Sequence, residues 1–386
     1  HGPFASLVQA LSTKQIPADD VNAQEMACLC VELYGAAARA SEMAEPERIP
    51  QFMTPSLQHL SGLMSYYARD LTVCERLLRV FRDYAEQFVA MLNQEQCLAL
   101  FRASADLLKS YSAHHCSSRV VTRPPSALEA NLEEEQSYGD ILCAIQLLIH
   151  LGTKDFIDVC TADNKGDSGT GINSSQVTDV IFFGLQQILP LMTQGLLQFP
   201  TLCVQYFSLV GFMMDTYPEK VCELPYDLFR SLLDSLLFGM SHEDSFVSKS
   251  SLCGVGGLVR EHLRTGALGR HLAAHGDVFD GCSQRLLREV IFQPVIWDRL
   301  EPAGMALLPL AAVDLTRFAA VVSLIAPRFG PEVKQRRVQV AFERLMQPDV
   351  LSKVVSGGYE GRMNRLKFKR DFEIFVRDVH SFLVIQ

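Results

Sequence analysis

The sequence predicts an all-α protein, built as a superhelical solenoid of antiparallel helix pairs. Apolar residues recur at three- and four-residue steps along almost the whole chain of 386 residues, which is the period of an α-helix. Helical stretches of about 20 residues give pairs of about 40, the period of HEAT and armadillo repeats. We find no stretch with the strict alternation of a strand. Together these observations predict stacked helix pairs rather than a sheet protein.

The helices of the first half are predicted from their apolar periodicity and from the connectors between them. Pro and Gly end helices, because one lacks an N–H and the other tolerates left-handed backbone. Such residues stand at 45–50, 122–126 and 198–201. The predicted helices are Asn22–Ala40, Pro55–Tyr67, Cys74–Leu92, Gln94–Ser112, Glu129–Gly152 and Ser174–Leu197.

The second half continues the same pattern. Connectors with Pro or Gly stand at 217–225 and 326–331. Several helices, such as Leu202–Met214, are apolar on more than one face, as a helix between two neighbours must be. The predicted helices are Phe199–Tyr217, Pro225–Gly239, Asp244–Arg264, His275–Phe292, Trp297–Val313, Leu315–Phe329, Pro331–Met346 and Gly361–Leu383.

We expect one continuous array over residues 1–386, with a variable loop at about 161–175. The opening His-Gly-Pro, residues 1–3, resembles a tag remnant. The chain is 48% hydrophobic, yet no apolar run reaches the ~18 residues that a membrane span needs. We therefore expect no membrane partner.

The charge distribution favours protein partners. The formal net charge is −9, but Glu332–Asp378 carries eleven Lys/Arg against seven Asp/Glu. An acidic chain does not suit direct nucleic-acid binding, and it attracts basic proteins. The basic stretch Gly361–Arg370 is either a solvated face of the last helix or a contact for an acidic partner.

One short stretch resembles the nucleophile motif of a serine protease. Gly-Asp-Ser-Gly at 166–169 would supply Ser168, and the stretch around His114 would supply the base. Only 54 residues separate the two, which is too few for the barrel that such enzymes need, and both flanks are helical. The chain is therefore expected not to be an enzyme, and the motif to lie in a loop.

Metal and nucleotide sites are also not expected. No Lys-Ser follows the glycines as in a phosphate-binding loop. In a calcium loop from Asp163, Lys165 stands where an acidic or amide residue is needed, and Ser174 stands where a bidentate Glu is needed. His114, His115 and Cys116 have no partner cluster, so a helix end explains them better than a metal. The eleven cysteines have no framework spacing, which indicates buried thiols in a reducing compartment. We predict no cofactor.

Two segments resemble a known family. Glu133–Asp158 and Asp179–Met240 resemble the C-terminal part of an exportin, a nuclear export receptor of the importin-β (karyopherin) superfamily. The resemblance lies in the turn Leu-Pro-Leu-Met, in the helix start after Phe199-Pro200 and in the connectors Tyr-Pro-Glu-Lys and Leu-Pro-Tyr-Asp-Leu-Phe. The final helix matches in character, whereas residues 241–360 diverge.

This resemblance implies a HEAT superhelix that carries protein cargo through the nuclear pore under control of Ran-GTP. It implies contacts with nuclear pore proteins, shuttling between nucleus and cytoplasm, and cargo such as a hypusine-bearing translation initiation factor and Smad proteins. The main Ran contacts of exportins lie in N-terminal repeats, so Ran-GTP is expected to act through the full-length receptor.

A hypusine side chain is long and cationic, so it calls for carboxylates. The candidate cargo-binding residues cluster at the two ends of one predicted helix, where acids at the N-terminus are equally explained by the helix dipole. They are Glu133, Glu134, Glu135, Asp140, Asp155 and Asp158. The alternative is a HEAT scaffold that binds proteins outside nuclear transport.

Overall fold

The computed structural model describes residues 2–17, 20–39, 48–115, 138–153, 174–294, 296–347 and 358–382. Every regular element in these ranges is an α-helix or a 3₁₀-helix, so the all-α prediction is confirmed there. The chain divides into two compact units, residues 1–205 and 206–386, and each is described by itself. The single continuous array stays a prediction.

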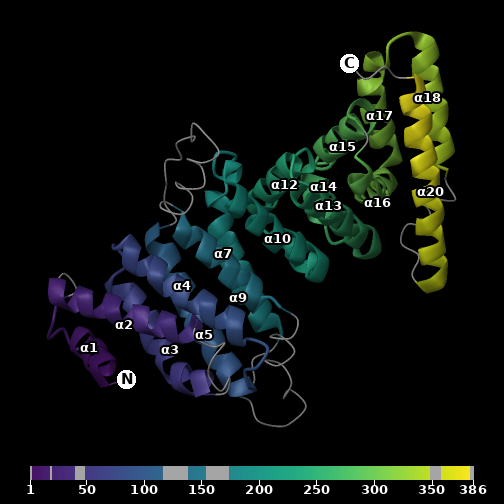
Figure 1. Ribbon diagram of the computed structural model, residues 1–386. Coiled ribbons are helices and arrows are strands. Elements are labelled where there is room, and N and C mark those ends of the chain that lie inside the picture. Colours follow the sequence, from purple (N-terminus) through teal and green to yellow (C-terminus); the bar gives the residue numbers. More distant parts are fainter. Residues whose placement is uncertain are drawn as a thin grey trace. The chain divides into compact units, whose positions relative to one another are not determined.

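The first unit is a sequence of packed helices (Figure 1). Each long helix packs against the second one after it: α2 against α4, α3 against α5, and α4 against α7. The elements are α1 (Gly2–Ser12), α2 (Val21–Arg39), α3 (Arg48–Tyr66), α4 (Leu71–Phe88), α5 (Gln94–His115), α7 (Gly139–Leu151), α9 (Ser174–Ile188), η2 (Leu189–Leu191) and η3 (Leu196–Gln198).

The second unit repeats this neighbour pattern, with α13 against α16 and α15 against α17. Helix α10 (Pro200–Thr216) begins before the boundary and continues into this unit. The other elements are α11 (Pro218–Cys222), α12 (Tyr226–Met240), α13 (Ser245–Thr265), α14 (Gly269–Ala274), α15 (Asp280–Phe292), α16 (Trp297–Val313), α17 (Leu315–Ile325), η4 (Ala326–Phe329), α18 (Glu332–Leu345) and α20 (Gly358–Phe382).

Side-chain caps explain where several helices begin. Asp70 accepts hydrogen bonds from the amides of Thr72 (2.9 Å) and Val73 (3.3 Å) at the start of α4. Asp244 does the same for Phe246 and Val247 at the start of α13, with distances of 2.8 and 3.0 Å. These carboxylates satisfy amides that have no partner inside the helix.

Two further termini show how local chemistry sets the helix ends. Asn93 and Gln96 form a reciprocal pair at the start of α5. The backbone amide of each residue donates a hydrogen bond of 3.0 Å to the side-chain oxygen of the other. Helix α13 stops at Gly266, whose φ of +72° is left-handed backbone that glycine adopts without strain.

Proline positions correct two of the predicted boundaries. Helix α3 begins at Arg48 and carries Pro55 in its interior, whereas the sequence predicts a start at Pro55. The helix predicted to reach Leu197 ends at Ile188, because Pro190 lacks the N–H that an α-helix needs and the chain continues as the 3₁₀ turn η2. The boundaries predicted for Trp297–Val313 are confirmed by α16, which also contains Pro302 and Pro309.

Three of the helices in the described ranges were not predicted. Helix α1 starts at Gly2, α11 occupies the connector predicted at 217–225, and α14 lies before the helix predicted from His275. Val221 and Cys222 of α11 are buried, so this connector contributes to the core. Short helices of five or six residues give too few turns for a period to be recognised.

In the described residues, no single helix is long and apolar enough to cross a membrane. Taken together, Trp297–Val313 and Leu315–Phe329 have a suitable length and composition, but they are bent by 118° relative to each other.

Candidate protein-binding site

One of the six predicted cargo-binding carboxylates lies in the described part of the chain. Asp140 stands in the first turn of α7 and is 1% exposed. Its Oδ2 accepts a hydrogen bond of 2.6 Å from the hydroxyl of Tyr111 on α5. This bond fixes α7 against α5 and keeps the carboxylate away from any partner. Glu133, Glu134, Glu135, Asp155 and Asp158 lie outside the described residues, and their role stays a prediction.

The histidine of the protease-like pattern lies at a helix end, as predicted. His114 is exposed in the last turn of α5, where its Nδ1 lies 3.0 Å from the carbonyl of Ser110. Its neighbour His115 stacks on Tyr111 at 5.2 Å and lies 3.5 Å from the Sγ of Cys74. Ser168 and Cys116 are outside the described ranges, and within those ranges no group of three His, Cys, Asp or Glu has the arrangement of a metal site.

The cysteines that the structure describes are mostly buried free thiols. Burial raises the pKa of the Cys143 thiol to about 11, and that of Cys222 and Cys282 to about 12. The thiolate is the reactive form, so these side chains are inert at neutral pH. They serve as small apolar core residues.

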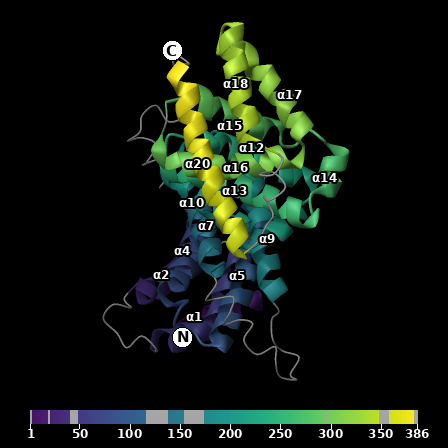
Figure 2. The same ribbon diagram turned by 90° about the vertical axis from the view of Figure 1, so that its right-hand side faces the viewer.

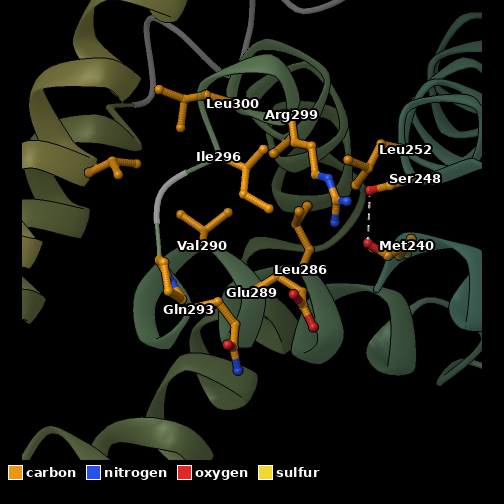
Figure 3. A pocket seen from close by; sticks show the side chains of 13 residues that line it. Met240, Ser248, Leu252, Leu286, Glu289, Val290, Gln293, Ile296, Arg299 and Leu300 are labelled. Carbon is orange, nitrogen blue, oxygen red and sulfur yellow. Dashed lines mark hydrogen bonds between the residues drawn. The ribbon is translucent and has the colours of Figure 1, made fainter. Parts of the chain in front are cut away.

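The second unit contains a small hollow of about 60 Å³ (Figure 3). Its apolar wall comes from Leu252 of α13, from Leu286 and Val290 of α15, and from Ile296 and Leu300 at the start of α16. Met240 of α12 and Val376 of α20 also line the hollow, and the helices converge here because α13 and α15 both pack against α16. The volume accommodates one aliphatic side chain of a partner.

Two charged side chains border this hollow (Figure 3). Glu289 accepts a hydrogen bond of 2.6 Å from the hydroxyl of Ser241. Arg299 donates from one terminal nitrogen to the carbonyl of Glu243 at 2.5 Å, while its Nε is buried without a partner among the described residues. An unpaired buried N–H is costly, so this nitrogen lowers the stability of the packing at the border of the hollow.

The first turn of α16 exposes large apolar side chains beside the hollow. Ile296 is 49% exposed and Trp297, the single tryptophan of the chain, is 67% exposed. Trp297 also lines a wider hollow of about 580 Å³, whose other walls include Cys253, Arg260 and Met305. Leu252 lines both hollows. Trp and Arg next to an apolar depression are typical of interface residues that carry binding energy.

Comparison with protein-family models and with solved structures identifies no family for the chain. No family model matches the chain. An engineered protein from the Northeast Structural Genomics Consortium aligns with a TM-score of 0.41 and 13% identity, over 83% of this chain and 97% of that chain. A second engineered protein from the same consortium aligns with a TM-score of 0.28 and 12% identity, over 98% and 99% of the two chains.

The exposed surface formed by Ile296, Trp297 and the two neighbouring hollows was not predicted from the sequence. The sequence marks Trp297 as the start of a helix, and its only signal of a site is a lone tryptophan after the polar and proline residues at 293–294. A tryptophan at a helix start is equally consistent with a core position. Its exposure is decided by how α13 and α16 pack.

Proposed function

We propose that this chain is the C-terminal part of a nuclear export receptor that resembles exportin 4 and binds protein cargo for Ran-GTP-dependent export. The observation that carries the proposal is the resemblance over Glu133–Asp158 and Asp179–Met240. On this proposal the protein shuttles between nucleus and cytoplasm and contacts nuclear pore proteins. Its cargo includes a hypusine-bearing translation initiation factor and Smad proteins.

The helix packing supports the HEAT-repeat superhelix that this proposal requires. In a solenoid each repeat contacts only its neighbours, so a helix packs against the equivalent helix of the next repeat. The contacts of α2 with α4, α3 with α5 and α15 with α17 follow this rule. Antiparallel pairs stacked in this way leave long faces free for a protein partner.

Two regions are proposed to contact cargo. The carboxylates Glu133, Glu134, Glu135, Asp155 and Asp158 would pair with a cationic hypusine side chain, whereas Asp140 is committed to Tyr111. The small hollow beside Trp297 would bury an apolar side chain of the cargo, with the side chain of Arg299 at its border.

The test for hypusine recognition is fluorescence anisotropy of a labelled hypusine-loop peptide, with the unmodified lysine peptide as the control ligand. We expect tighter binding of the hypusine peptide. Changing the five proposed cargo-binding acids outside the described residues to Gln or Asn is expected to weaken binding by about tenfold or more, since several ion pairs are lost together. Equal binding of both peptides would contradict recognition of the modification by these 386 residues.

A matched variant controls for the lost charge. It neutralises the same number of exposed acids elsewhere and is expected to retain hypusine binding. Those acids are Glu25, Glu95, Asp106, Glu219 and Glu223. Asp140→Asn is a second control, which should lower stability through the Tyr111 contact and leave the affinity unchanged.

The alternative is a HEAT scaffold outside nuclear transport. Ran-GTP distinguishes the two, because an exportin with its N-terminal repeats binds cargo more tightly when Ran-GTP is present and a scaffold does not.

The single tryptophan gives a second readout, which reports whether bound cargo covers the hollow beside Trp297. Cargo that covers Trp297 would shift its emission to the blue, and Trp297→Phe would remove that signal while Arg299→Gln would weaken the binding.

A further inference from the structure

The last helix, α20, has an outward face that no described part of the chain covers. Its inward face buries Phe368, Phe372 and Phe375, each 4% exposed or less. Phe375 lies 4.7 Å from the Phe342 ring on α18, and Lys369 forms a 2.5 Å ion pair with Glu301 on α16. The helix is therefore held in place on one side only. Figure 2, with α20 facing the viewer, shows it on the outside of the second unit.

The outward face consists of six residues at helical spacing: Met363, Leu366, Lys367, Arg370, Ile374 and Arg377. Steps of three and four residues place them on one side of a helix. Met363, Leu366 and Ile374 are 46%, 54% and 56% exposed. Apolar side chains of this size, aligned over about 17 Å of helix, indicate a surface that a partner covers.

The charges of this face are all positive. Lys367, Arg370 and Arg377 are exposed, and in the described part of the chain they form no ion pair. Gly361–Arg370 contains five basic residues and no acid, in a chain whose formal net charge is −9. Asp371, Glu373 and Asp378 flank the C-terminal half, so the positive potential is greatest at the N-terminal end of the helix.

We propose that the outward face of α20 binds an acidic amphipathic helix of another protein. A helix with leucine-like residues at steps of three and four buries Met363, Leu366 and Ile374, and carboxylates on the same side pair with Lys367, Arg370 and Arg377. This interaction does not depend on nuclear transport, and its site is separate from the two regions proposed to contact cargo.

The composition of the face argues against other occupants. A membrane-surface helix buries a continuous apolar face in lipid and keeps its bases on the opposite side. Here the continuous apolar side is already packed against α16 and α18, and the exposed side mixes apolar and basic residues. Three large apolar side chains have no role on a phosphate backbone. A second copy of α20 would oppose positive charge with positive charge.

The test uses the whole chain and a fluorescein-labelled helical peptide of about four turns, with leucine and glutamate on one face. A peptide of the same composition in scrambled order is the control ligand. We expect the amphipathic peptide to bind and the scrambled one to bind at least about fivefold more weakly, because only the former aligns apolar and acidic groups.

Two protein variants locate the site. Lys367→Glu with Arg370→Glu and Arg377→Glu should weaken binding by about tenfold or more, since three attractive pairs become repulsive. Leu366→Ser with Ile374→Ser should weaken it by about fivefold or more, since their burial is lost. All these positions are exposed or solvent-facing, and circular dichroism would verify that the helical content is retained.

Matched controls change equivalent positions elsewhere. Arg102→Glu with Arg285→Glu and Arg328→Glu gives the same change in net charge on exposed sites, and Leu29→Ser with Leu33→Ser removes exposed leucines from α2. Both should bind within about twofold of the unchanged chain. Equal weakening by the charge control, or equal binding of both peptides, would overturn the proposal. So would displacement of the peptide by duplex DNA or by vesicles of phosphatidylcholine and phosphatidylserine.

Discussion

Both units of the chain join helices through buried hydroxyl groups, and the first unit adds buried carboxylates. In the first unit, Asp83 is 3% exposed and accepts hydrogen bonds from Arg39 and Arg82, each at 2.8 Å. This carboxylate and Asp140 link helices through charged groups. In the second unit the hydroxyls of Tyr206 and Ser235 are 2.8 Å apart, and His271 Nε2 lies 3.2 Å from the carbonyl of Cys222.

This difference teaches which change each unit tolerates least. A buried charge that loses its partner costs several kcal/mol, so the first unit is sensitive to the removal of a carboxylate. A tightly packed neutral core is sensitive to volume instead. The outward faces differ as well, because exposed Met26, Leu29 and Leu33 on α2 are accompanied by Glu25, whereas those on α20 are accompanied by bases.

The largest effect is expected from Asp83→Ala in the first unit. The variant leaves Arg82, which is half-buried, without its carboxylate partner, and we expect a loss of about 3 kcal/mol in the free energy of unfolding. Urea unfolding followed by circular dichroism measures this. Asp106→Ala is the matched control, because Asp106 is exposed and accepts a hydrogen bond of 2.7 Å from the side chain of Gln58. It should cost less than about 0.5 kcal/mol, and equal losses would remove the distinction between the units.

A change of volume should have the next largest effect, in the second unit. A Cβ at Gly239 would overlap the hydroxyl of Ser251 and lie 2.6 Å from the Phe207 ring. We expect Gly239→Ala to destabilise the protein by about 2 kcal/mol, because the neighbours have to move. At Gly62, inside α3, nothing lies within 4 Å of the added carbon. Gly62→Ala should instead stabilise by about 0.5–1 kcal/mol, and a loss at Gly62 would show that α3 is more crowded.

The smallest effect is expected from pH, and it involves one histidine in each unit. Burial lowers the pKa of His150 and of His262 below the ordinary value of 6.5. The Nδ1 of His262 accepts a hydrogen bond of 3.2 Å from the amide of Leu268, which requires a neutral ring. The unfolded chain therefore binds protons at a higher pH than the folded chain.

The sign of the pH effect follows from this difference. The contribution of the two histidines to the free energy of unfolding is fully present above about pH 6.5. It is lost as the pH falls through the pKa of histidine in the unfolded chain, by less than about 1 kcal/mol for each partly exposed ring. Thermal unfolding measured from about pH 8 down to about pH 5 would show this decrease in stability. His150→Gln with His262→Gln should reduce it, whereas exposed His114→Gln should not. An increase in stability on acidification would contradict the burial of the neutral rings.

The helices were predictable because their signals are local. Aspartates before an apolar run, as at Asp70 and Asp244, and the Asn93–Gln96 pair are legible in the sequence, and the structure has caps at all three. Proline positions were less informative. Pro55 lies inside α3, whereas Pro190 ends α9. The sequence alone does not say where a neighbouring helix or turn can replace the backbone hydrogen bond that a proline removes.

The candidate sites were predictable only in part. Asp140 has the same local signature as its acidic neighbours, an acid near a helix start, yet its carboxylate is buried against Tyr111. Met363, Leu366 and Ile374 have the same period as the buried phenylalanines of their helix, but they lie on the opposite side. Sequence spacing assigns residues to one face of a helix and does not say which face the protein covers.

The sequence by itself determined the helical class of the described residues, most helix positions and the positive charge of the C-terminal stretch, because these depend on composition and on contacts within a few residues. The tertiary structure alone decided that Asp140 is buried, that Trp297 is exposed and that the basic and apolar residues of α20 share an uncovered face. These properties depend on which helices pack together, and that packing joins residues far apart in the chain.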